Sequence, residues 1–262
     1  MAAKPWLRDY FKRLADNIAT RQIVSESDLS LTVDFPKAGW SYKAKTLLEA
    51  LGYDKEYVTK QKLIRIGTVN ARADFLLGRD SNRWILDLKK PGEKCEQEKH
   101  VDQIQSYLVP EKIPFGILFS GELAFAFVDP DHECVRDLKP TEGELEQIPK
   151  LNLKKHPVSK VAMSPGETRD MVRFFQVLRY DAGMPAIEAL ARKLTGDYLR
   201  RVRSENKAKS RFEDISTIVE KMIESPDESF LDAMIHSSPR LTELRVTPKE
   251  MLEMWNIVTR SS

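Results

Sequence analysis

Apolar positions divide the chain into a strand-rich middle and helical ends. Between residues 62 and 128 they form short runs separated by Gly, Pro, Asn and Asp, a pattern that predicts β-strands joined by turns. The expected strands lie at residues 62–66, 72–77, 83–89, 115–119 and 123–128. A helix is expected at 96–108, between the third and fourth strands. This order predicts an α/β fold in which helices flank a mixed sheet.

Helical spacing dominates both ends of the chain. Residues 6–23 and 42–51 predict helices before the sheet, and Gly52 is placed to close the second one. Residues 138–166 are rich in Pro, Lys and Glu and have little periodicity, which favours a connector, within which a short helix could form near residues 142–148. We therefore expect a helical segment at 1–35, a mixed α/β core at 36–137, a linker at 138–166 and a small all-helical domain at 167–262.

Composition narrows the class of protein. Hydrophobic residues make up 41% of the 262 and charged residues 31%, enough for a core with a well-solvated surface. No stretch approaches the ~20 apolar residues of a membrane span, and the first residues lack the apolar segment of a signal peptide. Cys95 and Cys134 fit neither a disulfide framework nor a metal-ligand spacing. We expect a cytoplasmic protein with reduced thiols and no membrane contact.

Charge is nearly balanced overall, at +2, but it is uneven along the chain. Residues 192–211 contain eight basic residues and only two acidic ones. Such a stripe either follows nucleic-acid phosphates or is simply a solvated helix face, and the pattern favours neither. The candidate nucleic-acid contacts are Arg200, Arg201 and Arg203.

The candidate chemistry lies on two neighbouring strands. If residues 72–77 and 83–89 form a hairpin in which Leu77 pairs with Trp84, Asp74 lies directly opposite Asp87. Lys89 then shares their face because side chains alternate along a strand. Two carboxylates and an ammonium group therefore converge in a largely apolar setting, where uncompensated charge is costly.

A divalent cation is the natural compensation for two adjacent carboxylates. Their oxygen atoms suit Mg²⁺, with Mn²⁺ as a second choice. Such a cation polarises a phosphate oxygen and acidifies a bound water. Lys89 could orient that water or stabilise developing negative charge.

These residues resemble the motif of the PD-(D/E)XK nuclease superfamily, particularly the N-terminal nuclease domain of type I restriction-enzyme motor subunits. The resemblance covers about residues 40–128. Asp74 stands at the first acid, after Ala73 where the family has Pro, and Asp87 and Lys89 match the second acid and the lysine. The further matching positions are Pro91, the Gln-x-x-x-Tyr pair Gln103 and Tyr107, and residues 46–53, which resemble the LL-x-x-LG-[WY] element.

The resemblance implies a restriction-endonuclease-like sheet and a Mg²⁺-dependent endonuclease that hydrolyses DNA in a restriction or host-defence setting. It implies that Gln103 and Tyr107 lie near the metal or contact DNA, and that the Leu88 carbonyl is a further metal ligand. The family often adds an acid from the first core helix. Residues 35–48 contain no acid. Asp34 lies just before the expected helix and Glu26 further back, but Glu49 is assigned this role because it lies on the helix.

Other interpretations remain open. Asp74 could cap a turn or pair with a nearby arginine, and Asp87 with Lys89 could be a structural ion pair. The chain could then be a catalytically weak module that binds nucleic acid or assembles with a partner, and RNA is a third candidate substrate. The sequence has no Gly-x-x-x-x-Gly-Lys-[Ser/Thr] motif, so a motor or specificity subunit would be a separate chain. We also expect a homodimer or a larger complex.

Overall fold

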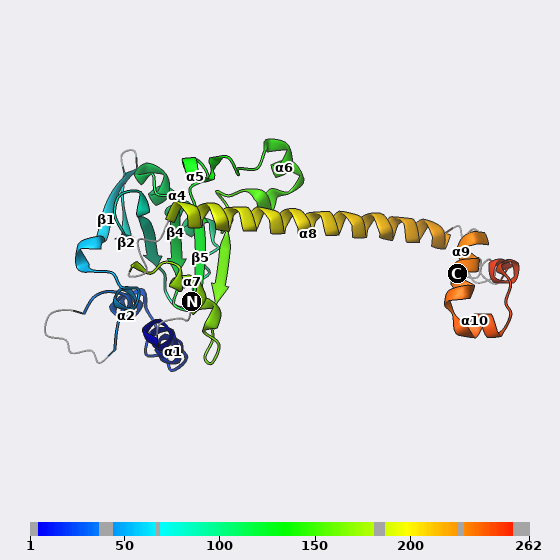
Figure 1. Cartoon of the computed structure of the whole chain (residues 1–262), viewed down its shortest axis with the longest axis horizontal. Helices are drawn as coiled ribbons and strands as arrows, with labels where there is room; N and C mark the ends of the chain where they lie inside the picture. Colours follow the sequence, from blue (N-terminus) through cyan, green and yellow to red (C-terminus); the bar gives the residue numbers. More distant parts are fainter. Residues whose placement is uncertain (1–4, 37–43, 67–68, 181–186, 225–227, 254–262) are drawn as a thin grey trace. The chain divides into compact units, whose positions relative to one another are not determined.

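The computed structural model describes residues 5–36, 44–66, 69–180, 187–224 and 228–253. The chain forms two compact units, Met1–Val202 and Arg203–Ser262. The first contains a sheet with helices around it, which confirms the expected α/β class (Figure 1). The second contains the end of helix α8 (Ile187–Glu224), α9 (Glu228–Ser237) and α10 (Pro239–Glu243).

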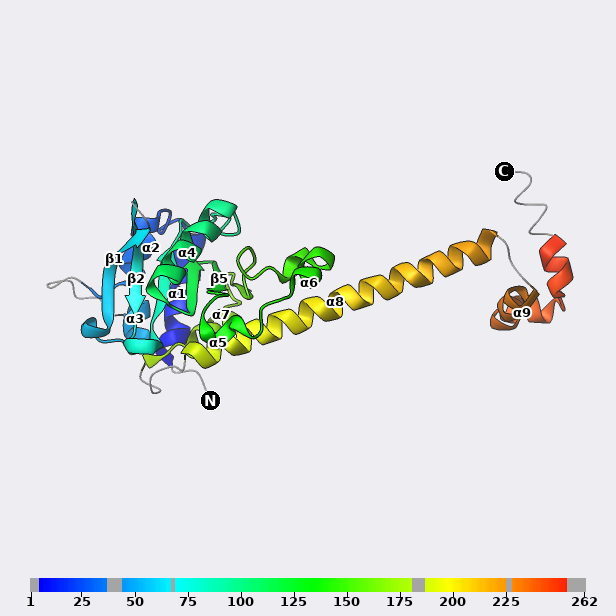
Figure 2. The same ribbon diagram turned by 90° about the horizontal axis from the view of Figure 1, so that it is seen from above.

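The sheet has six strands in sequential order, and its pairing is mixed. Only β3 and β4 run parallel, because helix α4 (Glu98–Glu111) carries the chain back between them. β1 and β2 lie at one edge of the sheet (Figure 2). The strands are β1 (Val58–Ile66), β2 (Val69–Leu77), β3 (Trp84–Leu88), β4 (Phe115–Phe119), β5 (Leu123–Val128) and β6 (Ser159–Ala162).

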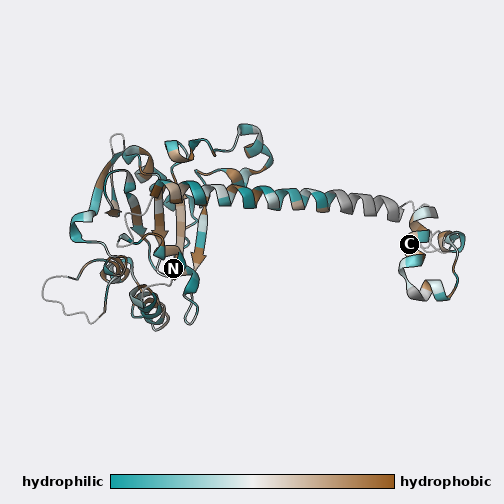
Figure 3. Ribbon diagram, viewed as in Figure 1, coloured by the Kyte–Doolittle hydropathy of each residue, from teal (hydrophilic) through white to brown (hydrophobic). Residues whose placement is uncertain are grey.

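Each face of the sheet packs on its own helices. Alternate residues of the central strands join a large apolar cluster with α1 (Pro5–Ala19), α7 (Arg169–Gln176) and the first turns of α8. The other face packs on α4. β3, β4 and β5 are therefore apolar along almost their whole length (Figure 3), as expected of strands covered on both sides.

The expected linker at 138–166 is wrong. This segment includes α6 (Glu142–Gln147), a short 3-10 helix (Pro149–Leu151) and β6, which pairs with β5. Leu151, Leu153 and Val158 are buried in the core. α7 also belongs to the first unit, so the division lies near residue 202 instead of 166. The sequence pattern did not predict β6, because this strand has only four residues and lies on a half-exposed edge of the sheet.

The helices before the sheet are also shorter than expected. α1 ends at Ala19, and a separate helix α2 (Glu26–Val33) follows, beyond the helix expected at 6–23. Its N-terminus is a capping box, in which Ser25 and Asp28 satisfy each other's backbone N–H groups. The helix expected at 42–51 is reduced to α3 (Leu47–Ala50) in its described part, and residues 42–43 lie outside the described residues. Gly52 closes it with a φ of 80°, as predicted.

Three short helical elements complete the first unit. α5 (Glu133–Arg136) follows β5, and short 3-10 helices at Lys55–Tyr57 and Asp80–Asn82 precede β1 and β3. Within the described part of the chain, no helix combines the length and apolar composition needed to cross a bilayer.

Candidate active site

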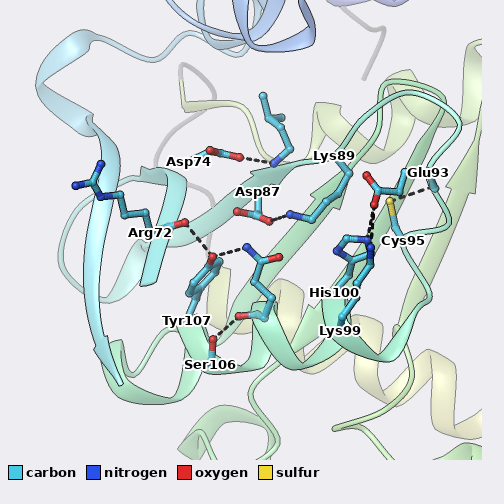
Figure 4. A network of polar contacts seen from close by, with 12 residues as sticks. Arg72, Asp74, Asp87, Lys89, Glu93, Cys95, Lys99, His100, Ser106 and Tyr107 are labelled. Carbon is cyan, nitrogen blue, oxygen red and sulfur yellow. Dashed lines mark hydrogen bonds and ion pairs between the residues drawn. The ribbon is translucent and has the colours of Figure 1, made fainter. Parts of the chain in front are cut away.

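The predicted hairpin forms with the predicted register. Leu77 pairs with Trp84 and Phe75 pairs with Leu86, so Asp74 and Asp87 follow as the next positions on β2 and β3. Asp87 is only 1% exposed and Lys89 only 5% exposed. The Lys89 ammonium group forms an ion pair with Asp87 Oδ2. The carboxylates and Lys89 gather beside each other, above α4 (Figure 4).

Asp74 lies where the ladder between β2 and β3 stops. The last paired residues are Phe75 and Leu86, so the Leu88 N–H has no backbone partner from β2. The Asp74 carboxylate takes that place, with Oδ2 accepting the Leu88 N–H at 2.7 Å. This contact draws the Asp74 carboxylate to the end of β3.

Gln61 holds the other oxygen of Asp74. Its side-chain amide donates to Asp74 Oδ1 at 3.0 Å. Gln61 has a φ of 49°, in the left-handed region that non-glycine residues seldom adopt. Such backbone strain concentrates at functional sites, and here it coincides with the residue that fixes the first carboxylate.

The buried ion pair leaves Asp87 incompletely compensated. Burial raises the pKa of Asp87 to about 7. The Lys89 ammonium opposes this rise, while the charges of Asp74 and Glu26 add to it. The net upward shift means that the folded protein stabilises the Asp87 carboxylate less well than water does. A cation bound beside Asp87 would relieve that deficit.

Gln103 and Tyr107 form a unit, and Tyr107 is buried. Its side chain is 1% exposed, and its hydroxyl donates to the Arg72 carbonyl at 2.9 Å. Gln103 donates to the same hydroxyl at 2.5 Å. Burial raises the pKa of Tyr107 to about 12, so the phenol stays protonated at neutral pH. Tyr107 therefore lies near the candidate carboxylates, whose charges act on it, and its hydroxyl fixes β2 two residues before Asp74. Contact of this pair with DNA stays a prediction.

Glu49 does not supply the helix acid. Its carboxylate accepts the backbone N–H of Thr46 at 2.9 Å and the Thr46 hydroxyl at 3.2 Å, which makes it the capping residue of α3. That assignment is wrong because the carboxylate is committed to the start of its own helix.

Glu26, the first residue of α2, is exposed to solvent but feels the charges of the site. Partial burial raises the pKa of Glu26, the carboxylates of Asp74 and Glu93 raise it further, and Lys89 lowers it. These interactions place the Glu26 carboxylate within electrostatic reach of the site. The capping box at Ser25 was the sequence signal that could have placed this acid at a helix start.

A second pair that the sequence did not suggest lies beside Lys89. His100 is buried in α4, and its Nε2 lies 2.8 Å from a carboxylate oxygen of Glu93. Burial alone would raise the pKa of Glu93, but hydrogen bonds from His100 and Lys99 outweigh it and lower the pKa. Glu93 therefore remains an anion near the site (Figure 4).

The basic stripe on α8 is exposed, as a solvated face would be. Arg200 pairs with Asp197, and Arg201 lies 5.8 Å from the centre of the Tyr198 ring. The Tyr198 hydroxyl in turn donates to the Lys150 carbonyl. Arg203 is exposed and belongs to the second unit. Nucleic-acid binding by these arginines stays a prediction.

The donor set fits a magnesium ion that keeps most of its water. Within the described residues, no three His, Cys, Asp or Glu side chains come close enough together to form a metal site by themselves. Asp74 and Asp87 supply two carboxylates. The Leu88 carbonyl lies on the same edge of β3 as the N–H bound by Asp74. Mg²⁺ commonly uses one or two carboxylates and several waters, so these groups suffice.

The Tyr107 hydroxyl should contribute measurably to stability. We expect Tyr107→Phe to lower the free energy of unfolding by about 1–3 kcal/mol, because it leaves the Arg72 carbonyl and the Gln103 amide without their partner. Urea unfolding followed by circular dichroism measures this. The exposed Phe212→Leu is the control and should change little. Equal midpoints for Tyr107→Phe and wild type would show that the hydroxyl does not secure β2.

Comparisons with family models, curated proteins and solved structures find no match for this chain.

Proposed function

We propose that this protein is a Mg²⁺-dependent nuclease that hydrolyses DNA phosphodiester bonds. The observation that carries the proposal is the convergence of Asp74, Asp87 and Lys89 at the end of the β2–β3 hairpin. The restriction-endonuclease-like fold and a restriction or host-defence role belong to the same proposal. They rest on the sequence resemblance.

The roles of the residues follow from their positions. Asp74, Asp87 and the Leu88 carbonyl would hold the cation, which when bound polarises a phosphate oxygen and acidifies a water. Lys89 would stabilise the negative charge that grows on the phosphate as the water oxygen bonds to phosphorus and the bond to the leaving sugar oxygen breaks. Glu26 and Glu93 would increase the negative potential that attracts the cation.

A second candidate is a nucleic-acid-binding or assembly module with weak catalysis. The buried ion pair of Asp87 and Lys89 favours it, because this pair already compensates part of the Asp87 charge. In this case the fold would bind nucleic acid without cutting it, or would need a partner chain to open the site. A separate motor or specificity subunit, or a second copy of the chain, would be such a partner.

Cleavage assays separate the candidates. Plasmid, single-stranded DNA and RNA are incubated with the protein and either Mg²⁺, Mn²⁺ or a chelator. The nuclease proposal predicts cutting of DNA that needs the cation. If the protein binds DNA but cuts it under none of these conditions, the binding module is favoured. Preferential cutting of RNA would show that RNA is the substrate.

The acid from α2 provides a sharper test of the site. Glu26→Gln should raise the Mg²⁺ concentration for half-maximal cleavage severalfold, because it removes a negative charge that would attract the cation. Glu49→Gln is the matched control: Gln also serves in a capping box, so cleavage and stability should stay near wild type. If Glu49→Gln raises this Mg²⁺ concentration more than Glu26→Gln does, Glu49 and not Glu26 acts at the site.

A further inference from the structure

The end of the β1–β2 hairpin extends beyond its neighbour in the sheet. β1 and β2 pair from Val58–Leu77 to Ile66–Val69, whereas β3 pairs with β2 only at residues 75–77. Residues 62–66 and 69–73 therefore form a two-stranded ribbon, and no other strand in the described part of the chain pairs with it. We call this segment the β1–β2 ribbon.

The two faces of the ribbon differ. Ile64 and Ala73 are fully buried, and together with Ala71 they pack in the cluster that includes α4. On the opposite face, Leu63 is 53% exposed, and Arg72, its direct cross-strand partner, is exposed as well. Arg65 is also exposed. α4 therefore supports the ribbon from one side and leaves an apolar residue between two arginines on the other.

The ribbon is also strongly basic. Residues 58–77 include Lys60, Lys62, Arg65 and Arg72, and their only acid is Asp74 of the candidate site. Lys60 and Lys62 form ion pairs with Asp34 and Glu111. Among the described residues, no carboxylate lies within ion-pair distance of Arg72. Its charge is therefore available to a ligand.

The ribbon is fixed directly to the candidate active site. The Arg72 carbonyl accepts the Tyr107 hydroxyl, and Arg72 precedes Asp74 by two residues, about 7 Å along the strand. The Arg72 side chain points away from the carboxylates, and Glu93 and Lys99 lie on the other side of them (Figure 4). DNA rises 3.4 Å per base pair along its axis, so for a strand that lies along this axis a base read by Arg72 would be about two base pairs from the phosphate at Asp74.

We propose that the β1–β2 ribbon docks in the major groove of duplex DNA and places the adjoining phosphates at the site. The inference rests on the proposed function. A two-stranded ribbon fits the width of the major groove, and arginine and apolar side chains are suited to its base edges and thymine methyl groups. A mononucleotide or a small phosphodiester would not reach both the ribbon and the carboxylates.

Binding should be measured apart from cleavage. Fluorescence anisotropy with labelled duplex DNA and no divalent cation gives the affinity at several salt concentrations. Arg65→Gln/Arg72→Gln should weaken duplex binding about tenfold or more with little change in the slope of log K against log salt, because side chains that read base edges displace few counterions from phosphates. Leu63→Ser should weaken duplex binding but leave the slope unchanged. The control is Arg169→Gln/Arg173→Gln on α7, another exposed pair of arginines.

Three further readouts separate this inference from the nuclease proposal. A ligand that fills the major groove should compete with the protein, and a minor-groove ligand should not. Hydrolysis of a small activated phosphodiester should be unchanged in the ribbon variants. Ribbon-dependent duplex binding by a wild type that cuts nothing would support the inference and overturn the nuclease. If the wild type cuts DNA and the ribbon variants bind and cut duplex DNA as well as the wild type does, the nuclease proposal stands and the ribbon inference is overturned.

Discussion

Replacing Asp87 by Asn should lower metal-dependent DNA cleavage by about a thousandfold or more. The change keeps the shape of the side chain but removes one of the two carboxylates that would hold the cation. Metal ions contribute several kcal/mol to charge stabilisation in the transition state, and about 1.4 kcal/mol corresponds to a factor of ten in rate. Single-turnover cleavage of a labelled duplex at saturating protein measures the loss.

Asp131→Asn is the matched control for this variant. Asp131 lies on the loop after β5, is about half exposed and pairs with Lys139 and Lys154. Its replacement should leave cleavage unchanged. Circular dichroism must show that Asp87→Asn is folded, because Lys89 loses the charge of its partner. A folded Asp87→Asn protein that cuts DNA at the wild-type rate would exclude Asp87 from the metal site and with it the proposed mechanism.

Replacing Lys89 by Met should destabilise the protein by about 1–2 kcal/mol at pH 8 without divalent cations. Removing one partner of a buried ion pair typically costs about 3–5 kcal/mol, but Asp87, whose pKa is already about 7, limits the loss by binding a proton. Lys89 and Asp87 are both almost fully buried and pair with each other. The double variant Asp87→Leu/Lys89→Met should recover most of the loss, since apolar residues often replace a buried pair without cost.

The loss in Lys89→Met should depend on pH. The pKa of Asp87 in the folded protein, about 7, already exceeds the value near 3.9 of an unfolded chain. Between these values the folded state binds more protons than the unfolded state, so the contribution of Asp87 to stability falls as pH rises from about 4 to 7. Without the Lys89 ammonium the pKa rises further, and the contribution falls over a wider interval.

Urea unfolding at pH 5 and pH 8 tests whether the stability loss of Lys89→Met increases with pH. At pH 5 Asp87 is protonated in both proteins, so Lys89→Met should lie close to wild type. At pH 8 a gap should be present, and it should widen further as the pH rises toward the higher pKa of Asp87 in the variant. An equal deficit at both pH values would show that Lys89 stabilises the fold through packing of its aliphatic chain instead of its charge.

Short-range patterns in the sequence determined much of the sheet. The apolar runs predicted β1 to β5 and α4, with boundaries within a few residues for β2 to β5 and α4. The turn at 78–83 determined the register of β2 against β3, and the pairing of Leu77 with Trp84 confirms it. Because side chains alternate along a strand, this register was sufficient to bring Asp74, Asp87 and Lys89 together.

The surroundings of these three residues depended on tertiary structure. The sequence motif did not reveal that the Tyr107 hydroxyl bonds to Arg72, 35 residues away, or that Asp74 replaces a missing strand partner of Leu88. It likewise could not choose between Glu26 and Glu49 as the helix acid. Propensity favoured Glu49 because it lies in a helix, yet a capping box is satisfied locally and removes that carboxylate from the site.

The strands, the hairpin register and the residues that carry the candidate chemistry can be predicted from local patterns, because alternation and turn formation act over a few neighbouring residues. Long-range packing is needed to explain why β6 completes the sheet, why Glu26 of α2 feels the charge of Lys89, and why the β1–β2 ribbon extends beyond β3. These features follow from packing between segments far apart in the chain. Local periodicity carries no information about which of those segments meet.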